Sequence, residues 1–161
     1  LGSYLPTDLE MDADETVTWV IDPEDYKADV LFVFENGRVA RVALSGYATK
    51  TNRKRLKNAI YGGSKLMYAT VLKEERDLAL VSSDYRLVNF NTSLLKTKTT
   101  NSTQGVQALT IKGSRTVTMV GTAEEFIGGK AQVEKFRAEK LPSAGAPMKE
   151  TDMKSLFDLE E

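Results

Sequence analysis

The sequence predicts an all-β protein built of propeller-like blades, and three observations support this prediction. The first is a β-hairpin pattern at Val30 to Leu44, where two apolar runs flank Asn36-Gly37, a dipeptide typical of a tight type I′ turn. The second is that the pattern returns at Leu78 to Asn91, offset by 48 residues. The third is a shorter echo at 15–21, 64–70 and 114–120. β-rich repeats with a period of about 50 residues are typical of propellers and related arrays.

Residues 1–13 are expected to form an acidic lead-in, and residues 14–63 the first blade repeat. Its first strand is expected at Thr16 to Ile21, where residues alternate with the period of two that a strand requires. The hairpin follows, with a first arm that is apolar on both faces. Gly46 to Gly63 is expected to be a connection, and a helix over Asn52 to Ile60 would end at Gly62-Gly63.

Residues 64–113 are expected to form the second blade repeat on the same plan. A strand at Leu66 to Leu72 leads through a charged turn into the second hairpin, and another strand is expected at Ala108 to Ile111. Tyr85 takes the place that Gly37 has in the first hairpin. Because a bulky residue at positive φ is costly, we expect a different turn here.

Residues 114–141 are expected to form a partial third blade, and residues 142–161 an acidic C-terminal tail that is loosely held. The partial blade would hold a strand at Thr116 to Val120, a short helix at Ala123 to Ile127 and a closing strand at Gln132 to Glu139. Two full repeats and a partial third do not close a ring.

The composition excludes several classes of chemistry. The chain has 161 residues, of which 41% are hydrophobic, enough for a folded core, and it contains neither cysteine nor histidine. Disulfides, thiolate chemistry and nucleophiles activated by histidine are therefore excluded. The sequence has no apolar run of membrane-spanning length and no signal-peptide pattern, so we expect a cytoplasmic protein without membrane contact.

The net charge of −1 hides a strong segregation of charge along the chain. Residues 1–35 carry ten acidic side chains and one lysine, whereas residues 36–120 carry fifteen Lys and Arg against four Asp and Glu. Residues 121–161 are again acidic, with nine acidic side chains against six basic ones. A basic block between acidic ends indicates a polyanion-binding face.

Several segments resemble the C-terminal domain of the DNA gyrase and topoisomerase IV A subunits. VLFVFENGRVARV resembles the hairpin of that domain, and DLALVSSDYRLVNFNTSLL is similar to its next copy. TNSTQGVQALTIKGSRTVTMV looks like the segment that joins one blade to the next, and LPSAGAPMKETD is similar to the chain ends of some Gram-positive members. The resemblance covers roughly residues 14 to 148.

This resemblance implies a β-pinwheel, in which blades of four antiparallel strands exchange strands with their neighbours. It implies a non-catalytic module of a bacterial type IIA topoisomerase A subunit that binds and bends duplex DNA without sequence specificity. The partners would be duplex DNA, the rest of the A subunit and the ATPase B subunit. No cofactor or metal is expected, and the catalytic tyrosine of the ATP-dependent parent enzyme would lie outside this chain.

The sequence departs from the family pattern in several places. It has too few repeats for a full pinwheel, so it resembles the last blades of a longer subunit. Asn101 stands where an arginine is usual, and Lys112-Gly113 where acidic residues are common. The Gln-Arg-Arg-Gly-Gly-Arg-Gly box of true gyrases is absent from this sequence, which leaves gyrase and topoisomerase IV both open.

The candidate DNA-binding residues lie in connections that equivalent blades would present on one rim. A rim of cations would bind phosphates by counterion release and would position the duplex without recognising its base sequence. The inter-repeat loop and its counterpart supply most of them, and arginines after the hairpin turns would extend the rim or pair with Glu35 and Asp84. The candidates are Lys50, Arg53, Lys54, Arg55 and Lys57, then Lys96 and Lys98, then Arg38, Arg41 and Arg86.

Other groups receive a structural interpretation. Trp19, Tyr68 and Met119 fall at matching positions and are expected in the core. The carboxylates at 12–15 suit surface repulsion of misplaced DNA better than a metal site, and no tyrosine has the surroundings of a nucleophile. An alternative function is a propeller-type protein-interaction module whose basic loops meet an acidic protein. An exposed aromatic hot spot beside those loops would favour that alternative.

Overall fold

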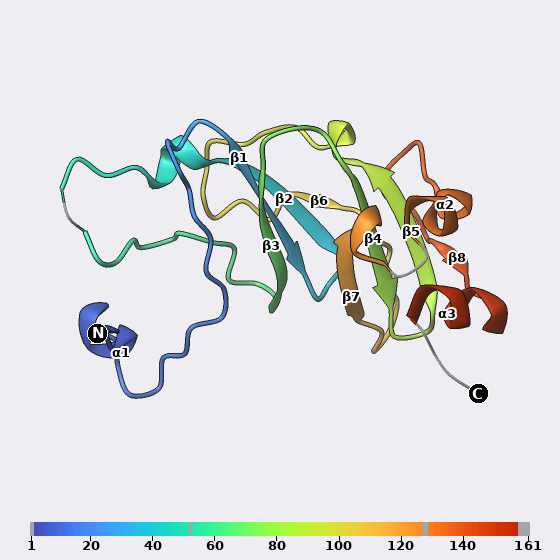
Figure 1. Ribbon diagram of the computed structural model, residues 1–161, viewed down its shortest axis with the longest axis horizontal. Coiled ribbons are helices and arrows are strands. Elements are labelled where there is room, and N and C mark those ends of the chain that lie inside the picture. Colours follow the sequence, from blue (N-terminus) through green and yellow to red (C-terminus); the bar gives the residue numbers. More distant parts are fainter. Residues whose placement is uncertain (1, 52, 127–128, 158–161) are drawn as a thin grey trace.

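Two four-stranded antiparallel sheets dominate the computed structural model, which describes residues 2–51, 53–126 and 129–157 (Figure 1). The strand order is β3-β1-β2-β6 in the first sheet and β7-β4-β5-β8 in the second. This confirms an all-β fold of separate blades that do not close on themselves. The strands are β1 (Asp29–Phe34), β2 (Arg38–Ala43), β3 (Leu66–Leu72), β4 (Asp77–Ser82), β5 (Arg86–Asn91), β6 (Val106–Gln107), β7 (Val117–Thr122) and β8 (Ala146–Pro147).

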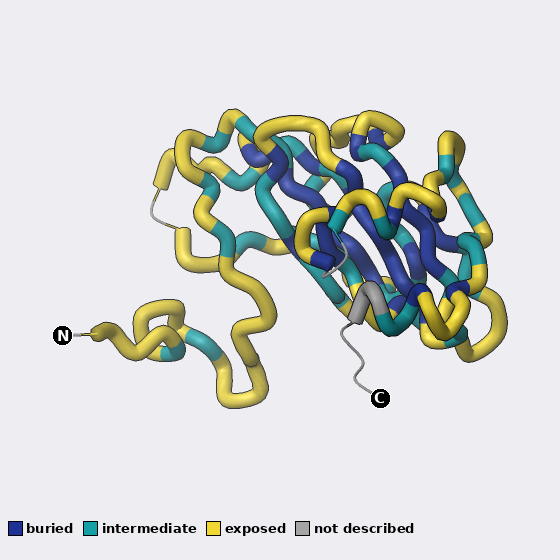
Figure 2. The backbone as a smooth tube through the Cα atoms, turned by 45° about the vertical axis from the view of Figure 1, so that its right-hand side comes forward, coloured by how far each residue is buried: buried dark blue, intermediate teal, exposed yellow. Residues whose placement is uncertain are grey.

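The two predicted hairpins form the centres of the two sheets. β1 pairs with β2 so that Val33 lies opposite Val39, and β4 pairs with β5 so that Val81 lies opposite Leu87. Both members of the second pair lie 48 residues after those of the first, so the hairpins repeat with the same register. The first strand of each hairpin, β1 and β4, is buried along almost its whole length because both of its faces are covered (Figure 2).

The two hairpin turns are alike, which corrects two expectations. The Gly37 N–H donates to the Phe34 carbonyl at 3.0 Å, and the Tyr85 N–H donates to the Ser82 carbonyl at 2.9 Å. Gly37 has a φ of +81° and Tyr85 a φ of +57°, whereas Asn36 does not adopt positive φ. Each loop is therefore a turn followed by one left-handed residue and not a type I′ turn. Tyr85 occupies this conformation at a position where the residue is 57% exposed.

Strands are exchanged between successive repeats. β3 belongs to the second repeat but pairs with β1 of the first, and β6 follows β4 and β5 in the chain but returns to pair with β2. In the same way β7 pairs with β4 and β8 with β5. The residues expected to open a third blade thus supply the outer strand of the second sheet.

Three apolar clusters hold the sheets and their outer faces. Leu31 of the first sheet and Phe90 of the second lie in the cluster between the sheets. The outer face of the second sheet is covered by helical segments near the C-terminus, which place Val133 and Phe136 against it, and by Met148, which lies between β8 and α3. These segments and the other helical turns are α1 (Leu5–Asp8), η1 (Leu44–Tyr47), η2 (Thr92–Leu94), η3 (Ala123–Glu125), α2 (Gly129–Val133), η4 (Glu134–Phe136) and α3 (Glu150–Phe157).

The C-terminal part differs most from the expectations. The closing strand expected at Gln132 to Glu139 is wrong: Val133 and Phe136, three residues apart, lie on one side of a helical segment and cover the apolar face of the second sheet. The closing strand is β8, inside the segment expected to be a loose tail, and Met148 there is buried. The short helix expected at 123–127 is confirmed as η3, although Ile127 lies outside the described residues.

The strand expected at Thr16 to Ile21 is not formed, and only β6 forms near the strand expected at Ala108 to Ile111. Described residues of the possible helix at 52–60 are irregular, while Asn52 lies outside the description. Trp19 and Met119 are each 43% exposed, so their expected place in the core is wrong. The Trp19 ring packs edge-on against Tyr68, with ring centroids 5.6 Å apart. The alternating residues at Thr16 to Ile21 do not form a strand because no strand of the described chain pairs with them.

Glycine-to-alanine substitutions with different expected costs test the backbone geometry at the start of β6, the fourth strand of the first sheet. Gly105 has a φ of +66°, and an added Cβ would lie 2.0 Å from the Val39 carbonyl oxygen. Gly105→Ala should lower the free energy of unfolding by about 3 kcal/mol through backbone strain and this clash. Gly113 has a φ of +62° and open space, so Gly113→Ala should cost about 1 kcal/mol.

Gly62→Ala is the matched control, because Gly62 has neither positive φ nor a neighbour within 4 Å. It should change the free energy of unfolding by no more than about 0.5 kcal/mol. Urea denaturation followed by circular dichroism measures all three variants. Equal losses at Gly105 and Gly113 would mean that the close approach to Val39 is absent.

Candidate nucleic-acid interface

The predicted basic connection is an exposed loop between η1 and β3, which we call the basic loop and define by Lys50, Arg53, Lys54, Arg55 and Lys57. It has no regular structure over its described residues and extends from the body of the first sheet (Figure 1). Its base is fixed at both ends. The Tyr47 hydroxyl donates to the Ala59 carbonyl at 2.5 Å, and the Tyr61 ring packs edge-on against Phe34. All five cationic side chains are exposed.

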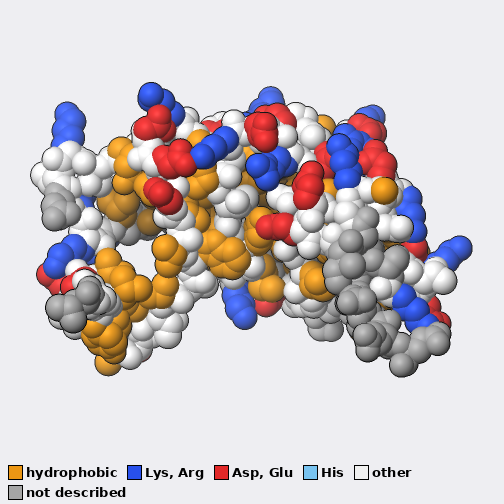
Figure 3. Space-filling view, in the orientation of Figure 1, with side chains coloured by type: hydrophobic (Ala, Val, Ile, Leu, Met, Phe, Trp, Pro, Cys, Tyr) orange, Lys and Arg blue, Asp and Glu red, His pale blue; other side chains and the backbone are white. Residues whose placement is uncertain are grey.

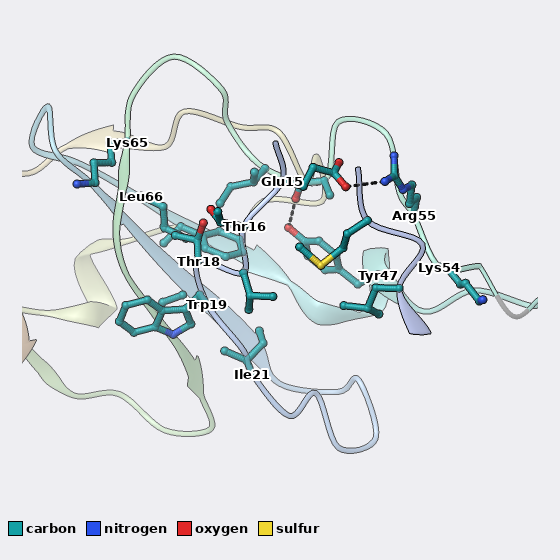
Figure 4. Close-up of a pocket in the computed structure, with 17 residues that line it drawn as sticks. Glu15, Thr16, Thr18, Trp19, Ile21, Tyr47, Lys54, Arg55, Lys65 and Leu66 are labelled. Atoms are coloured by element: carbon teal, nitrogen blue, oxygen red, sulfur yellow. Dashed lines mark hydrogen bonds and ion pairs between the residues drawn. The ribbon is translucent and has the colours of Figure 1, made fainter. Parts of the chain in front are cut away.

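The acidic N-terminal segment folds back onto the basic loop. We call residues 2–20 the N-terminal arm. Lys54 Nζ lies 2.7 Å from Glu10 Oε1, and the Arg55 guanidinium lies 3.3 Å from Asp12 Oδ2. The Arg55 guanidinium also contacts Glu15 at 2.5 Å (Figure 4). Hydrogen bonding to Lys54 lowers the pKa of Glu10. Sequence reasoning missed this contact, although the opposite charges of the two segments were its signal.

Three cations of the basic loop remain available. Lys50, Arg53 and Lys57 have no ion-pair partner within the described part of the chain. Their side chains therefore present an uncompensated positive charge to solvent. This is the arrangement that a phosphate-binding loop needs.

The second basic segment lies beside the start of the basic loop. The Lys98 N–H donates to the Arg41 carbonyl at 2.8 Å, and the Ala43 N–H donates to the Lys98 carbonyl at 2.9 Å. Asn101 Nδ2 donates to the Gly46 carbonyl at 3.0 Å, which ties this segment to η1. The exposed side chains of Lys96 and Lys98 thus share with the basic loop the corner where β2 ends.

Arg41 is held inside a polar cluster. Its Nε lies 2.6 Å from Asp29 Oδ2 and its Nη1 lies 2.8 Å from Glu75 Oε1, while the Thr92 carbonyl accepts a further bond at 3.2 Å. The side chain is only 16% exposed. Burial opposes its charge, but the two carboxylates outweigh burial and raise the pKa of Arg41. The geometry makes Arg41 a structural cross-link between repeats.

Arg38 and Arg86 hold the returning strands. Arg38 Nη1 donates to the Gly105 carbonyl at 3.2 Å, and Arg86 Nη2 donates to the Gly145 carbonyl at 2.8 Å. Gly105 and Gly145 both have a φ of +66°, so the two sites repeat in detail. Glu35 and Asp84, the acidic partners considered from the sequence, form no ion pair with these arginines in the described residues; Asp84 pairs with Arg115.

Asp77 begins the second hairpin and is almost completely buried. Its carboxylate accepts a hydrogen bond from Asn91 Nδ2 at 2.9 Å and lies within 3.4 Å of Arg137 and Lys130. Burial alone would raise the pKa of Asp77, but the Asn91 hydrogen bond and the two cations outweigh burial and lower it. Asp29 has the same place in the first hairpin, where Arg41 occupies the cation position.

A hollow of about 780 Å³ separates part of the arm from the outer face of the first sheet. Trp19, Phe32 and Leu66 contribute to its largely apolar lining, and Lys54 and Arg55 stand at its border (Figure 4). Figure 3 shows hydrophobic side chains gathered around this hollow. An exposed aromatic residue therefore does lie near the basic loop.

The carboxylates at 12–15 serve the arm contact, since Asp12 and Glu15 both face Arg55. Within the described ranges no group of three or more acidic side chains has an arrangement that could hold a metal ion. No described helix is long and apolar enough to cross a membrane.

Comparison with known proteins identifies the fold. No family model and no curated protein matches the chain. A crystal structure of the C-terminal domain of DNA topoisomerase IV matches it with a TM-score of 0.61 and 20% identity, covering 75% of this chain and 38% of that one. The chain therefore has the fold of that domain and spans well under half of its length.

Two further solved structures match with a TM-score of 0.49 each. A DNA gyrase A C-terminal domain is 19% identical, with 66% of this chain and 34% of that chain covered. The E. coli ParC C-terminal domain is 12% identical, with 65% of this chain and 42% of that chain covered.

The junction formed by Asp77 with Asn91, Lys130 and Arg137 predicts a loss of stability in acid. Asp77 has a folded-state pKa below its ordinary value of 3.8. The contribution of a lowered pKa is complete above the unfolded value and disappears as the pH falls through the folded value. The urea midpoint should therefore drop between pH 5 and pH 2.5, and Asp77→Asn should reduce this drop while costing about 2 kcal/mol at pH 6.

Asp14→Asn is the control, because Asp14 is exposed and has no ion-pair partner in the described residues. This variant should keep the parent's acid response. An Asp77→Asn protein as acid-sensitive as the parent would show that the junction does not carry the effect.

Proposed function

We propose that this chain is a non-catalytic DNA-binding and DNA-bending C-terminal module of a bacterial type IIA topoisomerase A subunit, from either gyrase or topoisomerase IV. The observation that carries the proposal is the corner at the end of β2, where the segment with Lys96 and Lys98 is hydrogen-bonded to β2 and to η1, the element from which the basic loop leaves the two-blade fold. The fold supports it because a solved structure with this fold is a topoisomerase IV C-terminal domain.

Exposed cations at this corner suit the phosphates of a duplex. Lys50, Arg53, Lys57, Lys96 and Lys98 have no ion-pair partner in the described chain, so a phosphate could approach each of them directly. Such contacts release counterions and carry no sequence information. Contacts at both loops would favour a bent duplex, because bending lets more phosphates reach the same surface.

The remaining candidate residues take secondary places in this proposal. Lys54 and Arg55 could reach DNA only after leaving the N-terminal arm. Arg38 and Arg86 would contact DNA with the donors that their glycine carbonyls do not occupy. Arg41 would support the rim from inside, since its donors are already shared among carboxylates and carbonyls.

The proposed setting is a larger cytoplasmic enzyme. The rest of the A subunit and the ATPase B subunit would be its partners, and the catalytic tyrosine would belong to another part of the A subunit. The module would supply no cofactor or metal chemistry. Its contribution would be to hold and bend the DNA on which that enzyme acts.

One observation favours a second candidate, a module that binds an acidic protein. Trp19 is 43% exposed and borders an apolar hollow whose edge carries Lys54 and Arg55. An aromatic anchor beside a cationic rim is typical of a protein-binding hot spot. Trp19→Ala should abolish such binding and leave duplex binding unchanged.

The DNA proposal predicts that the three open cations of the basic loop contribute to a salt-steep, sequence-independent affinity. Replacing Lys50, Arg53 and Lys57 by alanine should leave stability within about 0.5 kcal/mol, because exposed charges contribute little. The plot of log affinity against log salt should become shallower by roughly 0.9 per lost contact. Fluorescence anisotropy with two unrelated duplexes at several salt concentrations measures both effects.

A charge-matched control replaces Lys112, Lys140 and Lys149, which are also exposed but lie outside both basic segments. Its slope should stay closer to the parent's. If both triple variants lost affinity equally, only the net charge would matter and the corner would have no special role. If the parent bound neither duplex at low salt, the DNA proposal would fail.

A further inference from the structure

We propose that the N-terminal arm is an autoinhibitory element, in which the acidic stretch Glu10–Glu15 covers Lys54 and Arg55 and competes with a polyanion for them. The inference rests on the proposed function, because it describes how the basic loop of that function is regulated. The observations behind it are the contacts between the arm and the basic loop, which do not depend on what the loop binds.

The arm supplies oxygen acceptors where phosphate oxygens would otherwise lie. Arg55 donates to Glu15 Oε2 at 2.5 Å, to the Glu10 carbonyl at 2.7 Å and to Asp12 Oδ2 at 3.3 Å. Lys54 donates to Glu10 Oε1 at 2.7 Å. Guanidinium and ammonium groups bind carboxylates and phosphates through the same charge-assisted hydrogen bonds, so one ligand excludes the other.

The arm is held loosely enough to be displaced. Glu10 and Asp12 remain 70% exposed in their ion pairs, and ion pairs in water are weak and screened by salt. Apart from the edge-on contact of Trp19 with Tyr68, the rest of the arm adds little apolar contact. α1 contains no buried residue, Val20 is 75% exposed, and the hollow lies between the arm and the sheet. The arm stays on the basic loop because it belongs to the same chain, which gives its carboxylates a high local concentration at Lys54 and Arg55.

The open cations give the exchange a starting point. Lys50, Arg53 and Lys57 flank the covered pair in sequence and are not held by the arm. A duplex held by these three would bring further phosphates close to Lys54 and Arg55. The phosphates would then replace the arm's carboxylates, and the equilibrium would shift to the released arm by the difference in affinity.

The first experiment measures the cover itself, without DNA. The parent and an arm variant carrying Glu10→Gln, Asp12→Asn and Glu15→Gln are treated briefly with an acetylating reagent, and each lysine is quantified by mass spectrometry. In the parent, Lys54 should react several-fold more slowly than Lys50 and Lys57, whereas in the arm variant the three rates should be similar. Equal rates in the parent would overturn the inference.

The second experiment measures competition, with duplex DNA as the probe. The arm variant should bind more tightly than the parent at low salt, and its salt slope should be steeper by roughly 0.9 for each of the two uncovered cations. The matched control carries Asp8→Asn, Asp14→Asn and Asp22→Asn, which remove the same charge but form no ion pair with the loop. A control that gained affinity and slope equally would overturn the inference.

The two experiments separate this inference from the proposed function. Slow acetylation of Lys54 together with no duplex binding by either protein would leave the cover intact as a contact but refute the DNA function, and with it the competition. Duplex binding that the Lys50, Arg53 and Lys57 variant weakens, but that the arm variant leaves unchanged, would support the function and refute the autoinhibition.

Discussion

The closure of each blade by a returning strand is the constraint on which the rest of the structure depends. β2 and β5 would otherwise present open edges, and unpaired backbone groups at an edge must find partners. The chain solves this twice in the same way, with a left-handed glycine leading into a two-residue strand whose approach is fixed by an arginine, Arg38 in one blade and Arg86 in the other. Because the segment that returns to β2 also carries Lys96 and Lys98, closure of the first blade fixes where these two charges lie.

Local patterns predicted the hairpins, while features that depend on distant residues escaped prediction. Val30 to Leu44 and its copy have long apolar runs, and their period predicted two blades with the correct register. The strands β6 and β8 have only two residues each, too few for a recognisable alternation. Thr16 to Ile21 has the alternation of a strand, but sheet formation needs hydrogen-bonding partners that a periodicity cannot supply.

The sequence predicted which basic residues make up the candidate site but not the contacts that several of them make. Exposure of the basic loop followed from its lack of apolar residues. The pairing of Lys54 with Glu10 joins residues 44 positions apart, and the sequence signalled it only as a segregation of charge. Arg41 illustrates the converse: the sequence left it either on the rim or paired with a nearby acidic residue, and the fold pairs it with Asp29 and Glu75, which hold it inside the protein. The same side chain type thus serves as cross-link or as open charge according to what the fold places beside it.

The interleaving of strands has a consequence for how the chain is assembled during synthesis. β6 completes the first sheet, yet it leaves the ribosome only after both strands of the second hairpin. The edge of the first blade at β2 must therefore stay unpaired until the second hairpin has been made, and the second blade cannot be removed as one continuous segment without removing β6. We expect the two blades to unfold as one cooperative unit and not independently. This sets them apart from repeat arrays whose units each complete their own sheet.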